Sequence, residues 1–498
     1  MKTRHEKNLS ATLRVRSNSS GERYDPMIFG GFLEHFDTQI YGGVYEPGSP
    51  LADDDGFRLD VIDAIRELRT PIIRWPGGCF VDSYHWIKGV GPQREAYGEF
   101  RWGVMEPNTF GTHEFVEFCR RIGAEPYICF NGLASPQENL DWVLYCNATE
   151  GELAELRKAN GHPESLNVRY WSVGNERSDR PYIDRVRETA QKMKDMDPEL
   201  VIMCSGAHGG SHPVVNEYLF ETAATHLDLI SIHNYWLDRG KELLRYDYLT
   251  AIGKSEMPEK YISDCIKALQ DKGQLSELSI SFDEWNLRAW QHPGFPRNEV
   301  ADYEAPETRS LVEQRVREND LAEQYTMADA LFSASFLNAC LRHAKEVTMA
   351  CIAPLVNTRG PLFVHPDGIV KRTHFHTMAM YANLLGSRVV PLEVSSPDLS
   401  IGNEHVVTLD AIATVDDRGE EWSIALVNRH PSEALECTLS LPSGELNGSF
   451  KATQLNGDSP EAYNSLEQPD RVVPRDIEVV FKNGVTSLPP HSLTIVKA

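Results

Sequence analysis

Between residues 28 and 387, short apolar segments alternate with amphipathic stretches, and this alternation restricts the possible folds more than any other feature. The segments are continuously apolar, as is typical of parallel strands that are buried on both faces. In the stretches between them, apolar residues such as Val61, Ile65 and Leu68 recur at helical spacing. The eight candidate strands are residues 28–35, 72–77, 126–132, 170–176, 201–206, 229–235, 278–285 and 347–355.

Eight strand–helix units predict an α/β fold of the (β/α)8 or TIM barrel type, with enlarged loops. After the eighth unit the helical period disappears, and strand-like segments are separated by Gly, Pro, Asn and Asp turns, which predicts a jelly-roll-like β-sandwich. These segments are residues 406–415, 422–429, 435–441, 450–455, 477–481 and 493–497. We therefore expect N-terminal strands in residues 1–20 that join the sandwich, a catalytic barrel in 21–387 and the C-terminal sandwich in 388–498.

The formal net charge of −24 is spread along the chain, which argues against nucleic acid or an anionic membrane as the main partner. The N-terminus has no apolar signal segment, and no run of about 18 apolar residues predicts a membrane span. The nine Cys residues are scattered without metal-ligand spacing, as in reduced proteins. These features predict a cytoplasmic protein without metal or cofactor, and a neutral substrate such as a sugar.

Polar residues gather at the predicted strand ends, which converge on one pocket in a barrel. This set is acidic and aromatic, as sugar-binding sites are, and it contains no zinc, P-loop or dinucleotide pattern. Its members are Glu34 and His35, residues 74–79, Asn131, Asn175 and Glu176, residues 233–235, Glu284 and Asn357.

Two of these residues, Glu176 and Glu284, end the fourth and seventh candidate strands. Hydrolysis of a glycosidic bond needs two carboxyl groups that face each other across the anomeric carbon. Each glutamate alone could be a structural ion pair or a helix cap. Two of them at the ends of different strands, each set among aromatic residues, predict a pair of catalytic carboxylates.

Structural interpretations compete with functional ones at the other positions. Glu34 and His35 could support the barrel rim, and His233 could be a hydrogen-bonded histidine at a strand end. Arg74 could orient Glu284 from the pocket floor instead of contacting substrate. Cys79 could be a small residue of the pocket wall or take part in the chemistry.

Several motifs resemble those of glycoside hydrolase family 51 of clan A, the α-L-arabinofuranosidases. They include FGGFLEH at 29–35, IIRWPGGCFVDSYHW at 72–86, WSVGNE at 171–176, SIHNYW at 231–236 and DEWN at 283–286. The resemblance implies that Glu176 is the general acid/base and Glu284 the nucleophile. The resemblance also implies residues that bind the substrate. Together with the other pocket candidates, the predicted substrate-binding residues are Glu34, Arg74, Cys79, Trp102, Asn175, His233 and Tyr235.

The resemblance implies a retaining exo-α-L-arabinofuranosidase that releases terminal non-reducing residues from arabino-oligosaccharides by double displacement, in a homo-oligomer that is a hexamer in relatives. One alternative is another clan A furanosidase, or an endo-β-glucanase or xylanase. A different class is a non-catalytic sugar-binding protein, which would lack one of the two glutamates. The long connection at 288–317 predicts a rim or lid over the site, which favours the closed pocket of an exo-enzyme.

The chain departs from the family pattern at four places. Many relatives have Asn in place of Cys79, and the segment 177–182 after the first glutamate is different. Arg288 stands where Trp is frequent, and Pro354 replaces a frequent Gln. These departures predict an unaltered catalytic pair and an altered leaving-group side.

Overall fold

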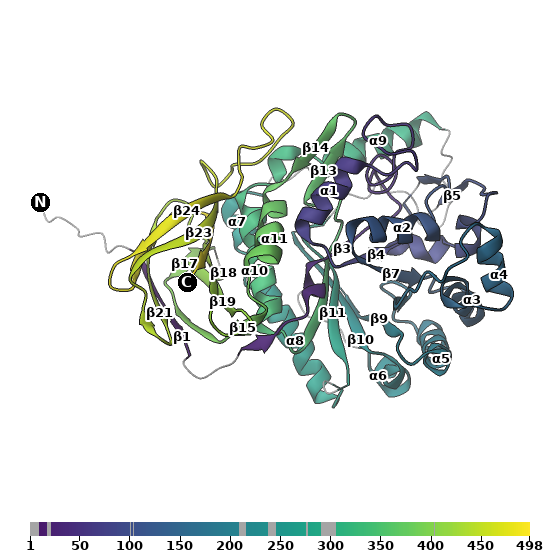
Figure 1. The fold of residues 1–498 in the computed structure, drawn as a ribbon, viewed down its shortest axis with the longest axis horizontal. Coiled ribbons are helices and arrows are strands. Elements are labelled where there is room, and N and C mark those ends of the chain that lie inside the picture. Colours follow the sequence, from purple (N-terminus) through teal and green to yellow (C-terminus); the bar gives the residue numbers. More distant parts are fainter. Residues whose placement is uncertain are drawn as a thin grey trace, which may run out of the picture.

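A computed structural model describes residues 9–16, 21–99, 101–102, 104–208, 216–237, 246–274, 277–289, 305–402 and 404–498. Eight parallel strands form a closed barrel, and each predicted segment supplies one of them (Figure 1). Strand β12 pairs with β3 and closes the ring, so the predicted α/β barrel is confirmed. The barrel strands are β3 Gly30–Phe32, β4 Ile72–Trp75, β7 Glu125–Phe130, β8 Tyr170–Val173, β9 Val201–His208, β10 Leu229–Leu237, β11 Ser279–Arg288 and β12 Val347–Ile352.

Helices between the strands cover the outside of the barrel (Figure 1). In the first of them, Val61, Ile65 and Leu68 are buried at the spacing that the sequence predicts. The α-helices are α1 Leu59–Leu68, α2 Thr112–Ile122, α3 Pro136–Asn147, α4 Glu152–Ala159, α5 Arg180–Met196, α6 Glu217–Thr222, α7 Tyr248–Ile252, α8 Met257–Asp271, α9 Pro306–Asn319, α10 Met327–Arg342 and α11 Thr373–Leu384. None of the helices that the structure describes has the length and apolar character that crossing a membrane requires.

Helix α10 is buried on almost every side because it lies between the barrel and the second domain (Figure 1). On the barrel side, the ring of Phe336 stacks on Trp285 of β11 at 3.8 Å between centroids. On the opposite side, Asn338 Nδ2 donates a 3.0 Å hydrogen bond to Asp410. A helix that is apolar all round is stable only in such an enclosed position.

The C-terminal region forms two sheets of a sandwich, as predicted. One sheet has the order β2-β15-β19-β20-β26-β23-β24, and the other has the order β16-β1-β21-β22 with β25 beside β21. Their bounds are β1 Ser10–Val15, β2 Glu22–Arg23, β15 Arg388–Val390, β16 Leu392–Ser395, β19 Leu409–Val415, β20 Trp422–Asn428, β21 Leu435–Leu441, β22 Gly444–Glu445, β23 Gly448–Asn456, β24 Arg475–Phe481, β25 Val485–Leu488 and β26 Ser492–Lys497.

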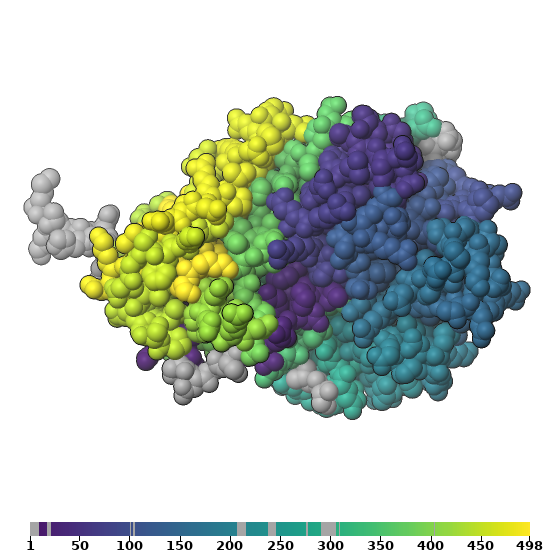
Figure 2. Space-filling view, viewed as in Figure 1, coloured from purple at the N-terminus to yellow at the C-terminus, as the bar shows by residue number. Residues whose placement is uncertain are grey.

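Strand β1 comes from the far N-terminus and lies between β16 and β21. The single segment predicted at 406–415 is two strands, because β18 (Glu404–Val407) pairs with β17 (Asp398–Ile401) before β19 begins. In Figure 2, the surface of the sandwich continues directly into that of the barrel. Two further hairpins are β5 Tyr97–Glu99 with β6 Val104–Glu106, and β13 Leu362–His365 with β14 Gly368–Lys371.

Candidate active site

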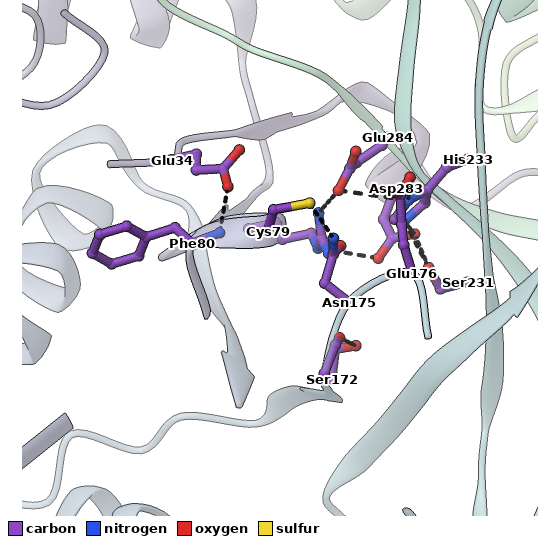
Figure 3. Close-up of polar contacts among 12 residues, drawn as sticks. Glu34, Cys79, Phe80, Ser172, Asn175, Glu176, Ser231, His233, Asp283 and Glu284 are labelled. Carbon is purple, nitrogen blue, oxygen red and sulfur yellow. Dashed lines mark hydrogen bonds and ion pairs between the residues drawn. The ribbon is translucent and has the colours of Figure 1, made fainter. Parts of the chain in front are cut away.

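The two candidate catalytic carboxylates meet at the carboxyl end of the barrel. Glu284 lies within β11, and Glu176 follows Gly174 and Asn175 after the end of β8. A carboxylate oxygen of Glu176 and one of Glu284 lie within 4.8 Å of each other. Figure 3 shows both side chains gathered with His233, whereas the carboxylate of Glu34 lies apart beside Phe80.

Glu284 is 2 % exposed and is held by two donors. Arg74 Nη1 binds its Oε1 at 2.6 Å, and the Tyr235 hydroxyl donates to its Oε2 at 2.8 Å. Both oxygens are thereby fixed in direction.

Arg74 organises three neighbours of the pocket floor. Besides Glu284, its guanidinium binds Asn175 Oδ1 at 2.7 Å and lies 3.3 Å from Asp283 Oδ2. Arg74 is 1 % exposed, and its flat face lies over the ring of Phe32. The structure therefore places Arg74 as the counter-ion of two buried carboxylates, in agreement with the floor-charge interpretation.

Glu176 has a different environment. Its side chain is 32 % exposed, and Oε1 lies 3.0 Å from Nδ1 of His233. Its backbone has φ of 45°, a left-handed conformation that is uncommon for a residue other than glycine. The turn through Gly174, which also has positive φ, directs this side chain back across the barrel mouth.

His233 lies between the two carboxylates and is anchored from below. Its Nδ1 is 3.0 Å from Glu176 and 3.5 Å from Glu284, and its Nε2 is 3.2 Å from Asp283. Burial disfavours its charge, but Glu284, Asp283 and Glu176 together raise the pKa of His233 to about 10. Burial likewise opposes the charge of Asp283, but Arg74 and His233 lower the pKa of Asp283 to about 2. His233 is therefore an imidazolium at neutral pH.

Glu176, His233 and Glu284 offer ligand atoms at a spacing that a metal ion could use. The charges around them do not fit a metal ion. A protonated imidazole has no free lone pair for a metal, and the guanidinium of Arg74 already binds Glu284. The three residues are better described as two carboxylates that share a cation.

Glu34 is completely buried and lies apart from the other two glutamates (Figure 3). Its Oε1 accepts hydrogen bonds from the backbone N–H of Phe80 and the indole N–H of Trp102, both at 2.8 Å. Burial, with a contribution from Glu284, raises the pKa of Glu34 to about 8, so the acid is mostly neutral at pH 7. Its Oε2 has no hydrogen-bond partner among the described residues.

The remaining predicted residues divide into two groups. Cys79 borders the pocket, where its sulfur lies 3.8 Å from Asn175 Nδ2, and burial raises the pKa of its thiol well above the usual value (Figure 3). His35 instead binds Glu106 at 2.7 Å and supports the rim. Asn131 accepts a hydrogen bond from the Leu133 N–H in a local turn, and Asn357 donates one to Thr38, which is distant in sequence, so neither joins the carboxylates.

Asp283 is one site residue to which the sequence reasoning assigned no role. Neighbouring residues of a strand normally point to opposite faces. The pairing of β11 with β12 is irregular between Phe282 and Trp285, and this irregularity lets Asp283 and Glu284 both contact Arg74. The DEWN motif contains Asp283, but sequence spacing alone does not reveal the irregular pairing.

Arg288 does not lie on the leaving-group side, so this part of the prediction is wrong. It is 3 % exposed and forms a two-point ion pair with Asp329 at the start of α10, with distances of 2.7 and 2.9 Å. Within the 288–317 connection, residues 290–304 lie outside the described part of the chain. Helix α9 follows them, and Arg315 binds the carbonyl of Trp102 at 2.8 Å.

The segment after Glu176 does line a cavity. A hollow of about 390 Å³ lies next to this carboxylate. Its described lining consists of Cys79, Asp82, Arg101, Asn175, Glu176, Arg177, Ser178 and Asp179. Arg177 begins the segment 177–182, which the sequence analysis connected with an altered leaving-group side. Asp82 and Arg101 were not predicted as site residues, because nothing in their spacing marks them.

Comparison with known proteins agrees with this geometry. Family descriptions match an α-L-arabinofuranosidase 1 domain at residues 64–247 and an α-L-arabinofuranosidase C-terminal domain at 283–492. The chain is 32 % identical to a probable α-L-arabinofuranosidase C of Aspergillus terreus, covering 98 % of this chain and 97 % of the relative. It is 30 % identical to an intracellular exo-α-(1→5)-L-arabinofuranosidase of Streptomyces lividans, covering 91 % and 70 %.

Among solved structures, the family 51 α-L-arabinofuranosidase of Thermotoga petrophila superposes with a TM-score of 0.84 at 29 % identity. The match covers 98 % of this chain and all of the other. The similarity therefore includes the barrel and the sandwich together. The chain belongs to glycoside hydrolase family 51, the α-L-arabinofuranosidases, and is a glycoside hydrolase.

Proposed function

We propose that this chain is a retaining exo-α-L-arabinofuranosidase in which Glu284 is the nucleophile and Glu176 the general acid/base. The observation that carries the assignment is the approach of the two carboxylates to within 4.8 Å. Retaining glycosidases hold their carboxyl groups about 5–5.5 Å apart, whereas inverting enzymes need about 6.5–9.5 Å to admit a water molecule. The spacing therefore supports double displacement.

The unlike surroundings of the two carboxylates support their separate roles. In the first step, ionised Glu284 attacks the anomeric carbon, and the bond from that carbon to the leaving oxygen breaks. Arg74 and Tyr235 bind both Glu284 oxygens and hold the carboxylate in position for this attack. Glu176, which borders the cavity, gives its proton to the departing oxygen.

In the second step, Glu176 removes a proton from water, and the water oxygen attacks the anomeric carbon of the glycosyl ester. The ester bond breaks, Glu284 leaves as a carboxylate, and the product regains the original anomeric configuration. His233 faces both carboxylates, so its positive charge offsets whichever of them is ionised.

We assign the furanose hydroxyls to Glu34, Asn175 and Tyr235, with Trp102 and Cys79 as neighbouring walls. A neutral Glu34 can both donate and accept a hydrogen bond, and its Oε2, unpartnered within the described part of the chain, leaves one position for a substrate hydroxyl. The exo mode and the cytoplasmic location follow the description of the Streptomyces lividans relative. We also propose that the chain forms a homo-oligomer and that its domains divide at residues 20 and 387.

The test uses 4-nitrophenyl α-L-arabinofuranoside with the wild type, Glu284→Ala and Glu176→Ala. We expect Glu284→Ala to reduce turnover to background. Glu176→Ala should lose about 10²- to 10⁴-fold on substrates with poor leaving groups and much less on the nitrophenyl substrate. Added azide should rescue Glu176→Ala to an α-configured glycosyl azide, and any rescue of Glu284→Ala should give the β-anomer.

The proposal fails if the wild type cleaves no furanoside, or if Glu284→Ala keeps near wild-type turnover. Proton NMR of the first product formed separates retention from inversion. Release of single arabinose units separates the exo mode from an endo-acting glucanase or xylanase.

A further inference from the structure

The cavity beside Glu176 lies on one side of the proposed reaction centre. Its described lining includes Glu176, Asn175 and Cys79, but neither Glu284 nor Tyr235. The group that protonates the leaving oxygen therefore borders this space, and the group that attacks from the opposite side does not. A volume of about 390 Å³ is within the range of about 300–1,000 Å³ that small-molecule sites occupy. The space fits the sugar that departs.

Asp82 is a buried carboxyl group that lines this cavity. It belongs to the 3₁₀ helix η2 (Cys79–Ser83) and is 8 % exposed. Arg101 and Arg177 both bind its Oδ2, the latter at 3.3 Å. Its Oδ1 has no hydrogen-bond partner in the part of the chain that the structure describes. Burial raises the pKa of Asp82, although both guanidinium groups act against this rise.

Arg177 follows Glu176 in the segment after β8 and contacts Asp82 from that side of the cavity. Its Nη2 binds Asp179 at 3.0 Å, and its Nε is a buried donor without a partner among the residues described. A buried donor and a buried acceptor that both lack partners cost free energy unless a ligand or water satisfies them. Adjacent hydroxyls of a sugar offer both an acceptor and a donor, and so match this pair.

We propose that Asp82 and Arg177 form a subsite that binds the hydroxyl groups of the neutral sugar carrying the arabinofuranosyl residue. The inference rests on the proposed function, because it takes Glu176 as the donor of the proton to the leaving group. Arg101 positions the Asp82 carboxylate through its own contact with Oδ2. A neutral ligand is favoured because the two guanidinium groups face Asp82, Asp179 and Glu176 in the same cavity.

The experiment compares two substrates that place different groups in this subsite. 4-Nitrophenyl α-L-arabinofuranoside has an aryl leaving group without hydroxyls, whereas α-(1→5)-linked arabinobiose has a sugar. For Asp82→Asn and Arg177→Met, we expect kcat/KM for arabinobiose to fall roughly 10- to 100-fold, the size expected for charged hydrogen bonds. For the nitrophenyl substrate, kcat/KM should stay within about 3-fold of the wild-type value, because its aryl group has no hydroxyls to lose a contact.

Ser178→Ala is the matched control, because Ser178 lines the same cavity and its side chain makes no contact on which the inference depends. It should leave both substrates unchanged. Arg177 is partly exposed, so Arg177→Met keeps the test valid if Asp82→Asn does not fold, and thermal unfolding of each variant checks this.

An equal fall for both substrates would show that Asp82 and Arg177 only hold the loops together, and unchanged values for arabinobiose would show that they touch no sugar. Either result overturns the subsite. If the wild type cleaves neither substrate, the proposed function itself fails, which is a distinct result.

Discussion

At the scale of single residues, the site is a balance of buried charges. Asp283 and Glu284 are almost fully buried carboxylates, and Arg74 and His233 are the buried cations that contact both of them. Removing one partner of such a group leaves an uncompensated charge, which costs far more than an exposed ion pair contributes. The contacts within this cluster therefore fix the positions of the four side chains and the charged states of His233 and Asp283.

Glu34 gives this balance a pH dependence that can be measured. Its folded pKa of about 8 is higher than its unfolded value of about 4.3, so the folded state keeps the proton longer. Its contribution to stability is complete below about pH 4.3 and is lost as pH rises through about 8. In urea unfolding, Glu34→Gln should become more stable relative to wild type between pH 5 and pH 8, and the difference should level off above pH 8.

The exposed ion pair of Arg16 with Glu393 supplies a control for this measurement. Glu393→Gln should differ from wild type by the same small amount at each pH. A constant difference for Glu34→Gln as well would contradict the raised pKa. His233 acts in a later window, because its contribution is present below about pH 6.5 and is lost as pH rises through about 10.

At the scale of elements, the turn after β4 shows how backbone conformation positions a side chain. Gly77 has φ of 140°, which side chains rarely permit, and a Cβ there would lie 2.3 Å from Cγ of Glu34. The glycine thus lets Glu34 lie directly against the turn that carries Cys79. The following residue, Gly78, is similarly close to the Glu34 carboxylate.

We expect Gly77→Ala to lower the free energy of unfolding by about 1–3 kcal/mol and to displace Glu34. The KM for the nitrophenyl furanoside should rise, because a hydroxyl-binding group has moved. Gly123→Ala is the matched control, since Gly123 ends α2 with φ of 77°, and a Cβ there would meet no heavy atom of the described residues within 4 Å. It should cost about 1 kcal/mol and leave KM unchanged; an unchanged KM for Gly77→Ala would contradict the role of the turn.

At the scale of the whole molecule, α10 joins the barrel and the sandwich into one unit. Asp410 of β19 accepts hydrogen bonds from Asn338 at 3.0 Å and Arg342 at 2.9 Å, both on α10. Arg429, next to β20, binds Glu256 at the start of α8. The two domains share buried polar contacts as well as an apolar helix.

We therefore expect a single calorimetric transition for the wild type. Asp410→Ala should shift this whole transition downward, because the buried amide of Asn338 loses its acceptor, which costs about 1–3 kcal/mol. Glu393→Ala, which breaks an exposed pair on the sandwich, should shift it far less. Two separate transitions, or loss of sandwich signal while hydrolytic activity persists, would contradict the coupling.

The sequence predicted the elements well because their signals are local. Continuous apolar runs identified all eight barrel strands, and Glu176 follows the fourth as expected, whereas Glu284 lies within the seventh, which continues to Arg288. Interpretation failed where a residue acts through a distant partner. Arg288 is an example, since its carboxylate partner Asp329 is on another element and only the fold brings them together.

By itself, the sequence determined the barrel, the sandwich and the family, because burial periodicity and motif order are properties of the chain in one dimension. The tertiary structure decided how the charges are arranged. Irregular pairing of β11 turns Asp283 inward beside Glu284, and the left-handed turn at Glu176 directs its carboxylate to His233. These contacts depend on distances between strands, and residue spacing along the chain does not encode them directly.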